Sequence, residues 1–273
     1  MTAVMRNLSI LVTFMLIGWP LSSFADGSAA TKMAGYDVVL LGETHDNPDH
    51  HTRQKEIVTA LQPTAIVWEM LTQEQAAKVS DALIADQSAL EAALEWDKSG
   101  WPSFDLYYPI FQAVTGAKSY GGHVPRPAAR AAFRTGIKAA FGDEAGAYGL
   151  MDPLTADEQT AREASQMRAH CDALPEELLP DMVAIQRLRD ARLAQAVVKA
   201  YAATGGPVVV ITGTGHARKD WGVPVYLARV APELTVFALG QFEAGSSVGE
   251  FDLVLDSPAV DRDDPCAAFK DKG

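Results

Sequence analysis

Three short apolar runs indicate that this protein has a core of buried strands. They cover residues 38–41, 65–70 and 208–211, and their apolar residues are mostly consecutive rather than alternating with polar ones. Such strands are typical of a parallel sheet that is covered on both faces. A helical stretch at about residues 49–61 separates the first two runs, which gives the order strand, helix, strand. The pattern predicts an α/β fold with a mainly parallel central sheet flanked by helices.

The other predicted elements place a helical insertion after the second strand. It comprises two short helices within residues 72–94 and a helix at 104–117. A weak third strand is predicted within residues 118–125, where two consecutive glycines lower the β propensity. We expect later strands at 234–239 and 251–255, helices at 126–140, 155–171 and 176–203, and a Gly-rich linker at 142–153. No repeat or shift in composition divides the chain, so residues 26–273 are predicted to form one domain.

Composition and charge agree with a folded, soluble protein. A chain of 273 residues can bury a substantial core, and its 48% hydrophobic and 21% charged residues are ordinary for a globular domain. The formal net charge is −12. Because binding to phosphates requires a basic surface, we do not expect nucleic acid to be a partner.

The first 25 residues have the pattern of an export signal. Arg6 supplies a positive charge, residues 8–21 are apolar, and Ser23-Phe24-Ala25 is a small-x-small cleavage site. The sequence therefore predicts a signal peptide at residues 1–25 and a periplasmic location for the mature chain. An uncleaved N-terminal anchor is the alternative, although the apolar segment is short for a membrane span. No Cys lies near the cleavage site, so a lipoprotein is not expected.

The predicted export determines how the two cysteines, Cys171 and Cys266, are interpreted. In an oxidising compartment two lone cysteines can pair, and the bridge would tie the C-terminal tail to the body of the protein. Ligation of a metal or haem by Cys171 is the alternative. We predict the disulfide.

Ionisable side chains stand at the ends of the three strongest apolar runs. Glu43 and His45 follow the first run, Glu69 lies near the end of the second, and His216 follows the third in a Gly-rich loop. Ligands of open α/β sheets bind beyond the carboxyl ends of the strands, and the ends of parallel strands share one edge. We therefore expect these four side chains to gather at one edge of the sheet.

This set of residues fits two kinds of chemistry. Imidazoles and carboxylates together suit a transition metal, and an open coordination position would allow hydrolysis. Histidine and tyrosine are equally protein ligands for haem iron, with aromatic residues covering the porphyrin. The residues alone therefore predict a metal or cofactor site without choosing between catalysis and binding.

The long helix predicted at 176–203 carries further polar candidates. Gln186, Arg189 and Asp190 interrupt an otherwise apolar stripe on this helix. Burying such side chains costs free energy unless they are hydrogen-bonded, so they usually line a site or form a core network. Either interpretation places this helix near the chemistry.

Two other segments add candidates for binding. Arg218 ends the Gly-rich loop at 213–218, where the glycines allow a ligand to approach the backbone closely. Tyr107 and Tyr108 lie in the helix predicted at 104–117 and cannot both face the same side of it. One of the two phenols can therefore face a cleft.

Four segments resemble the ChaN-like haem-binding family of the Tiki/TraB superfamily. They span most of the mature chain in order and read LGETHDNPDHH at 41–51, WPSFDLYYPI at 101–110, QRLRDA at 186–191 and GTGHARKDWGVP at 213–224. The superfamily pattern is two GxxH motifs with a glutamate. Here the two motifs are residues 42–45 and 213–216.

The resemblance implies an iron-acquisition protein that binds haem as a homodimer and serves haem-uptake machinery of the envelope. It implies a tyrosine as the iron ligand, for which Tyr107 is our prediction, with Tyr108 and Tyr226 as alternatives. The wider set of residues expected at the haem is His45, His216, Gln186, Arg189 and Arg218. Two departures from the family are the missing lipid-accepting Cys and a VPRPAAR segment at 124–130 in place of one with Asn-Pro-Arg.

The same resemblance supports a rival hypothesis. Tiki proteases are similar in their two GxxH motifs and use a divalent metal to cut peptides. A hydrolase of this kind would bind a metal such as Mn or Co through His45 and His216, with Glu43 or Glu69 as ligand or general base. A weaker third possibility is a periplasmic module that only recognises another protein.

Overall fold

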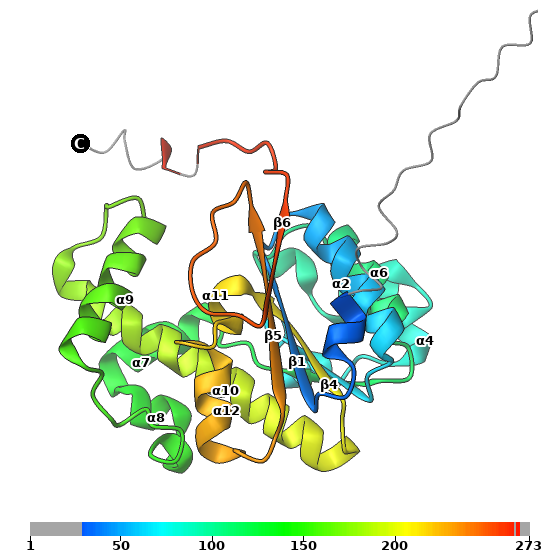
Figure 1. Ribbon diagram of the computed structural model, residues 1–273, viewed down its shortest axis with the longest axis horizontal. Helices are drawn as coiled ribbons and strands as arrows, with labels where there is room; N and C mark the ends of the chain where they lie inside the picture. Colours follow the sequence, from blue (N-terminus) through cyan, green and yellow to red (C-terminus); the bar gives the residue numbers. More distant parts are fainter. Residues whose placement is uncertain (1–28, 265, 268–273) are drawn as a thin grey trace, which may run out of the picture.

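A six-stranded parallel sheet forms the centre of the molecule (Figure 1). The computed structural model describes residues 29–264 and 266–267, so the predicted signal peptide and the domain boundary at residue 26 lie outside the described residues. The strands have the order β3-β2-β4-β1-β5-β6, and every neighbouring pair is parallel. The predicted fold class is confirmed. The strands are β1 (Val38–Glu43), β2 (Ala65–Trp68), β3 (Lys118–Gly121), β4 (Val208–Gly213), β5 (Val236–Glu243) and β6 (Leu253–Ser257).

The register of the central strands brings the predicted site residues to one edge. β1 pairs with β4 so that Glu43 lies opposite Gly213, the first residue of the second GxxH motif. β2 also pairs with β4, and Trp68 lies opposite Ile211. Glu69, one residue further, therefore reaches the same level as the two motifs. The carboxyl ends of three strands thus meet where the strand-end rule places a ligand site.

Helices cover both faces of the sheet and create two apolar cores. One core joins the sheet to α7, α8, α10 and α12, and the other joins it to α2, α6 and the short helices after β2 (Figure 1). The inward residues of β1 alternate between the cores, with Val38 and Leu40 in the first and Val39 and Leu41 in the second. The helices are α2 (Pro48–Leu61), α3 (Gln73–Ala76), α4 (Asp81–Ile84), α5 (Gln87–Ala93), α6 (Phe104–Ala113), α7 (Arg126–Thr135), α8 (Ile137–Phe141), α9 (Ala156–Ala169), α10 (Leu179–Thr204), α11 (Thr214–Ala217) and α12 (Val223–Val230).

The helical insertion after β2 is present, but several predicted boundaries were wrong. Three short helices replace the two predicted within 72–94, and α6 ends at Ala113 before a turn through Gly116, whose φ is +90°. The helix predicted at 126–140 is divided at Gly136, whose φ of +83° no helix accommodates. The short helices α11 and α12 after β4 were not predicted; α11 has only four residues, and α12 is a mainly apolar segment of eight residues.

Beyond β6 the chain forms a tail that is attached at two points. Cys266 forms a disulfide with Cys171, just after α9, which confirms the predicted bridge. Nearer to β6, the Arg262 guanidinium donates to Asp46 at 2.7 Å and to Glu243 at 2.7 Å. Asp46 lies next to His45, so the tail contacts the loop of the first motif directly.

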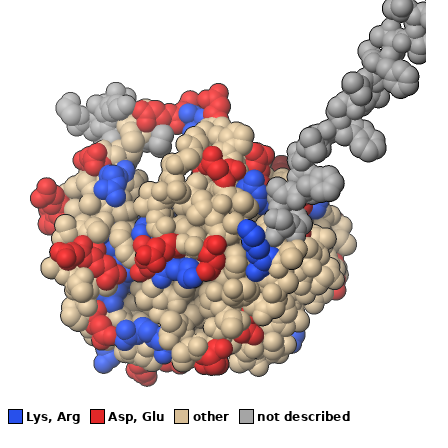
Figure 2. Space-filling view, in the orientation of Figure 1, with Lys and Arg blue, Asp and Glu red and all other residues tan. Residues whose placement is uncertain are grey.

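Surface charges lie interspersed on the face shown in Figure 2. Surface ion pairs of the protein include Arg229 with Asp152 at 2.5 Å and Lys219 with Asp252. Exposed pairs of this kind contribute about 0–1 kcal/mol each. The acidic excess of the sequence is therefore not concentrated in one patch on this face.

No helix in residues 29–264 and 266–267 is long and apolar enough to cross a membrane.

Candidate functional site

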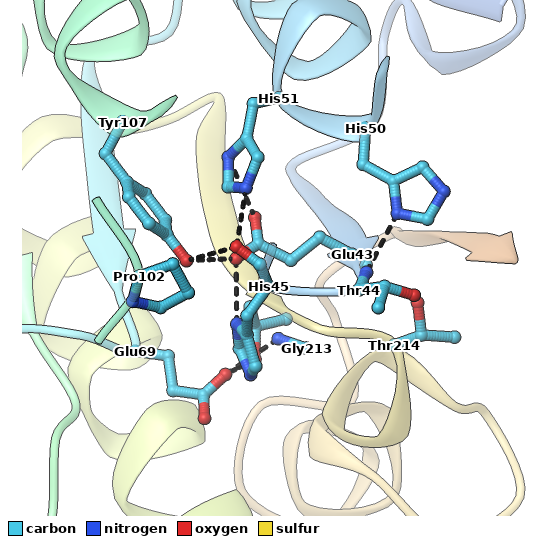
Figure 3. A network of polar contacts seen from close by, with 12 residues as sticks. Glu43, Thr44, His45, His50, His51, Glu69, Pro102, Tyr107, Gly213 and Thr214 are labelled. Carbon is cyan, nitrogen blue, oxygen red and sulfur yellow. Dashed lines mark hydrogen bonds and ion pairs between the residues drawn. The ribbon is translucent and has the colours of Figure 1, made fainter. Parts of the chain in front are cut away.

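Glu43 is the centre of a buried polar network at the end of β1 (Figure 3). Its Oε1 accepts a hydrogen bond from the Tyr107 hydroxyl at 2.7 Å and lies 2.8 Å from His45 Nδ1. Its Oε2 lies 3.7 Å from His51 Nδ1 and has no hydrogen-bond partner within the described residues. The Glu43 carboxylate therefore orients the His45 ring through its contact with Nδ1.

The loop of the first motif is held by the first turn of α2. Asn47 caps this helix by accepting from the backbone N–H of Asp49 at 2.9 Å. His50 Nδ1 accepts from the Thr44 N–H at 2.8 Å, and His51 Nε2 donates to the His45 carbonyl at 2.9 Å. Both histidines are buried, so they brace the loop instead of presenting a ligand.

Glu69 joins the second motif to the end of β2. Its Oε2 accepts from the Thr212 hydroxyl and the Gly213 N–H, both at 2.7 Å. Its Oε1 lies 3.4 Å from His216 Nε2, and the other ring nitrogen of His216 lies 2.6 Å from Asp190 on α10. His216 is therefore fixed between two buried carboxylates from different elements.

The first glycine of each motif permits a close contact that a side chain would block. A Cβ on Gly42 would lie 2.8 Å from the Leu239 carbonyl oxygen and 2.9 Å from Thr214 Cα. A Cβ on Gly213 would lie 2.9 Å from His45 Nε2. Cβ atoms do not approach other atoms this closely, so the motif glycines let β1, β4 and the His45 ring meet at the sheet edge.

Nearby carboxylates raise the pKa of both motif histidines. Burial alone would lower the pKa of His45, but its hydrogen bond to Glu43 and the charge of Glu69 raise it to about 9. Burial likewise opposes the charge on His216, yet Glu69 and Asp190 raise its pKa above the ordinary value. Burial would raise the pKa of Glu69, but the charges of His216 and His45 bring it down to about 2. Glu69 is thus a carboxylate that lies between two imidazoles and raises the pKa of both.

A cavity of about 760 Å³ opens beside this network. The volume lies within the range of about 300–1,000 Å³ that is usual for ligand sites. Its walls combine apolar, basic and imidazole side chains from the insertion after β2, the segment after β3 and α10. Among the lining residues are Met70, Trp101, Val124, Leu193, Lys78, Lys98, Arg126, Arg189, His45, His123 and His216.

Several predicted site residues line this cavity. His45 and His216 do so from the two motifs, Glu69 from the end of β2, and Gln186 and Arg189 from α10. The Gln186 side-chain oxygen is buried and has no hydrogen-bond partner in the part of the chain that the structure describes. The stripe of polar residues on α10 therefore faces the site, as its sequence pattern indicated.

Tyr107, the predicted iron ligand, does not face the cavity. Its side chain is completely buried, and its hydroxyl donates to Glu43 instead of facing the cavity. Burial and the Glu43 charge raise the pKa of Tyr107 far above its ordinary range, so the group remains a phenol. The alternatives do not fit either, because Tyr108 donates to the Ile84 carbonyl and Tyr226 is buried. The interpretation of Tyr107 as an iron ligand does not agree with this geometry.

Arg218 also lies outside the large cavity. It donates to Asp220 at 2.9 Å, and its guanidinium carbon lies 3.7 Å from the centre of the Trp221 ring. It lines a separate cavity of about 150 Å³ together with Arg162 and Asp190. Gln186 and His216 line both cavities, so the two are adjacent, and Arg218 lines only the smaller one.

The four predicted metal ligands meet but do not form a metal site. Within residues 29–264 and 266–267, no group of three or more His, Cys, Asp and Glu side chains is arranged to hold a metal ion. Glu43, His45, Glu69 and His216 hydrogen-bond one another or nearby donors instead. The geometry gives no support to the hydrolase hypothesis.

Sequence reasoning missed His123 and Trp101. His123 lies two residues beyond the end of β3, and Trp101 packs edge-on between its ring and that of His45. The centroid of the Trp101 ring is 4.9 Å from that of His45 and 5.7 Å from that of His123. The strand-end rule that selected His45 would also have selected His123, had β3 been predicted with its end at Gly121.

Comparison with known proteins identifies the family of this chain. A family model described as haem-binding uptake, Tiki superfamily, ChaN matches residues 29–227. No curated protein sequence matches the chain.

A solved structure shares the fold of this chain, whereas two others are less similar to it. A structure described as cofacial heme binding to ChaN of Campylobacter jejuni is 23% identical, with a TM-score of 0.60, covering 83% of this chain and 87% of that one. The type III effector HopBA1 is 12% identical, with a TM-score of 0.45 and coverages of 85% and 91%. A Bacillus cereus protein is 14% identical, with a TM-score of 0.46 and coverages of 87% and 74%. At 23% identity the Campylobacter structure shows a common fold.

Proposed function

Because this chain belongs to the ChaN family of haem-binding uptake proteins in the Tiki superfamily, we propose that it binds haem in the cavity beside His45 and His216. The observation that carries this proposal is the family match, which extends over residues 29–227 and includes every element that lines the cavity. When bound, the group would supply an iron centre, and this chain's own residues would hold and orient it.

The residues of the cavity fit such a group in three respects. Trp101, Val124 and Pro125 offer apolar wall to a macrocycle, while the volume is adequate for a large planar ligand. Arg126 and Arg189 offer guanidinium groups to its two carboxylates, a pairing that is often bidentate. Imidazole side chains in the wall are common ligands of haem iron.

Hemin titration of the purified protein tests the proposal. We expect a Soret shift that saturates at one or a few equivalents at micromolar hemin, and no shift would refute haem binding. Arg126→Ala should weaken binding, because a charge-assisted hydrogen bond contributes about 1.5–3 kcal/mol. Arg130→Ala is the matched control, since Arg130 lies on the same helix one turn further, is exposed and does not line the cavity.

We also propose that the protein is exported and works in the periplasm in haem or iron uptake. The signal pattern of residues 1–25 supports export, and the Cys171–Cys266 disulfide fits an oxidising compartment. N-terminal sequencing of the protein from a periplasmic fraction should begin at Asp26. Recovery only in the cytoplasm with an intact N-terminus would refute export.

A homodimer that serves haem-uptake machinery of the envelope completes the proposal. The family resemblance supports it, and light scattering of the protein with and without hemin tests the oligomeric state. A monomer under both conditions would refute the dimer. Co-purification with envelope transport proteins from haem-fed cells tests the partner.

A further inference from the structure

The side chains that can ligate haem iron are few in this cavity. Haem iron in proteins is held by histidine, cysteine, methionine or tyrosine. Both cysteines form the disulfide, and Met70, the methionine in the wall, is buried. None of the seven tyrosines lines the cavity; they are Tyr36, Tyr107, Tyr108, Tyr120, Tyr148, Tyr201 and Tyr226. Histidine is therefore the residue type that this chain presents to an iron.

Two of the three histidines in the wall are committed elsewhere. His216 uses both ring nitrogens, since one contacts Asp190 at 2.6 Å and the other lies 3.4 Å from Glu69. His45 uses Nδ1 for Glu43, and its Nε2 occupies the space that a Cβ on Gly213 would need. The free nitrogen of His45 is therefore packed against the backbone of the sheet edge.

His123 has the opposite environment. Its backbone is rigid, because its N–H donates to the Leu71 carbonyl at 2.9 Å and the preceding Gly122 N–H donates to Trp68 at 3.0 Å. Its half-buried ring packs edge-on against Trp101 and hydrogen-bonds to the backbone of Glu69, which leaves the second ring nitrogen for a ligand. Metal-bound histidines are usually oriented by such a bond from the other nitrogen.

The charges around His123 suit both the iron and the haem carboxylates. Burial lowers the pKa of His123, and although the Glu69 charge opposes this, the nearby Arg189 and Arg126 reinforce it. Arg189 and Arg126 also line the cavity and can pair with carboxylates.

We propose that His123 ligates the haem iron in this protein, in place of a tyrosine, with Arg126 and Arg189 beside it binding the haem carboxylates. The inference rests on the proposed haem-binding function and deepens it. It assigns to the segment after β3 the ligand that the family resemblance sought on α6.

The test uses the full mature protein with ferric hemin, and reads the identity of the ligand from optical, electron paramagnetic resonance and resonance Raman spectra. The wild type should show an imidazole complex without phenolate modes. His123→Ala should lose that signature and at least tenfold in hemin affinity, and added imidazole should restore the signature. His123→Tyr should introduce phenolate modes, a gain that appears only if position 123 faces the iron.

Other outcomes overturn the inference in distinguishable ways. Phenolate modes in the wild type, or an unchanged spectrum in His123→Ala, would show that another residue ligates the iron while haem binding stands. Loss of the imidazole signature in His45→Ala but not in His123→Ala would assign the ligand to His45. Absence of any Soret shift in the wild type would remove the proposed function and this inference together. Circular dichroism of each variant confirms that it is folded.

Discussion

Replacing Tyr107 by Phe should cost stability without changing haem ligation. The substitution removes one oxygen, whose proton is donated to Glu43 Oε1 across 2.7 Å in a fully buried position. The other Glu43 oxygen already lacks a hydrogen-bond partner among the described residues, so the carboxylate would depend on His45 alone. Hydrogen bonds to charged groups contribute about 1.5–3 kcal/mol. For a protein of this size each kcal/mol lowers Tm by about 2–4 °C, which gives a decrease of about 3–12 °C.

Tyr108→Phe is the matched control for this prediction. Its hydroxyl donates to the neutral Ile84 carbonyl at 2.8 Å, for which about 0.5–1.5 kcal/mol is expected. Thermal and urea unfolding of both variants, followed by circular dichroism, should show the larger loss for Tyr107→Phe. Equal or smaller destabilisation than in Tyr108→Phe would refute the assigned role of Glu43. A lost Soret band in a folded Tyr107→Phe variant would refute its placement outside the cavity.

Three further substitutions probe the motif, the tail and the disulfide. Gly213→Ala places a Cβ 2.9 Å from His45 Nε2, so calorimetry should show a loss of about 1–3 kcal/mol; a neutral effect would contradict this packing. The Arg262 hydrogen bond is the main reason that the pKa of Glu243 falls from 4.5 to about 2. Because the pKa of Glu243 is lowered in the folded state, the Arg262–Glu243 pair stabilises the protein above pH 4.5. This contribution to the free energy of unfolding is lost as the pH falls towards 2. In Arg262→Ala the free energy of unfolding should therefore depend less on pH in that window. An unchanged pH dependence would refute the stabilising role of the Arg262–Glu243 pair. Cys266→Ser should lower the unfolding free energy by about 2–4 kcal/mol in urea, and reductant should reproduce this only in the wild type.

Local sequence pattern determined the sheet and the edge where its site lies. The consecutive apolar residues at 38–41, 65–68 and 208–211 are typical of strands buried on both faces in a parallel sheet. Parallel strands end at one edge, which is where Glu43, Glu69 and His216 were expected, and the strand order β2-β4-β1 makes the three strands neighbours. These are short-range consequences of composition, and the structure bears them out.

Tertiary packing decided which side chains at that edge face the cavity. Tyr107 and His123 differ in this respect for reasons that no local pattern contains. Tyr107 lies on a helix whose buried face packs towards α2 and the end of β1, so its hydroxyl meets Glu43 beneath the site. His123 follows a strand of only four residues that is recognisable mainly through its pairing with β2. Because the β propensity of this segment is weak, the sequence placed the strand only within residues 118–125 and left its end at Gly121 undefined.

The first GxxH motif shows the division within a few residues. Its sequence alone placed Glu43 and His45 after a buried strand, because the apolar run stops at Gly42. Only the folded chain shows that Glu43 points inward and His45 lies in the cavity wall. Successive side chains of a strand face opposite sides, and whether a side is core or cavity depends on helices distant in sequence, here α6 and α10. The edge of the sheet is thus a local property, whereas the lining of the site is set by long-range contacts.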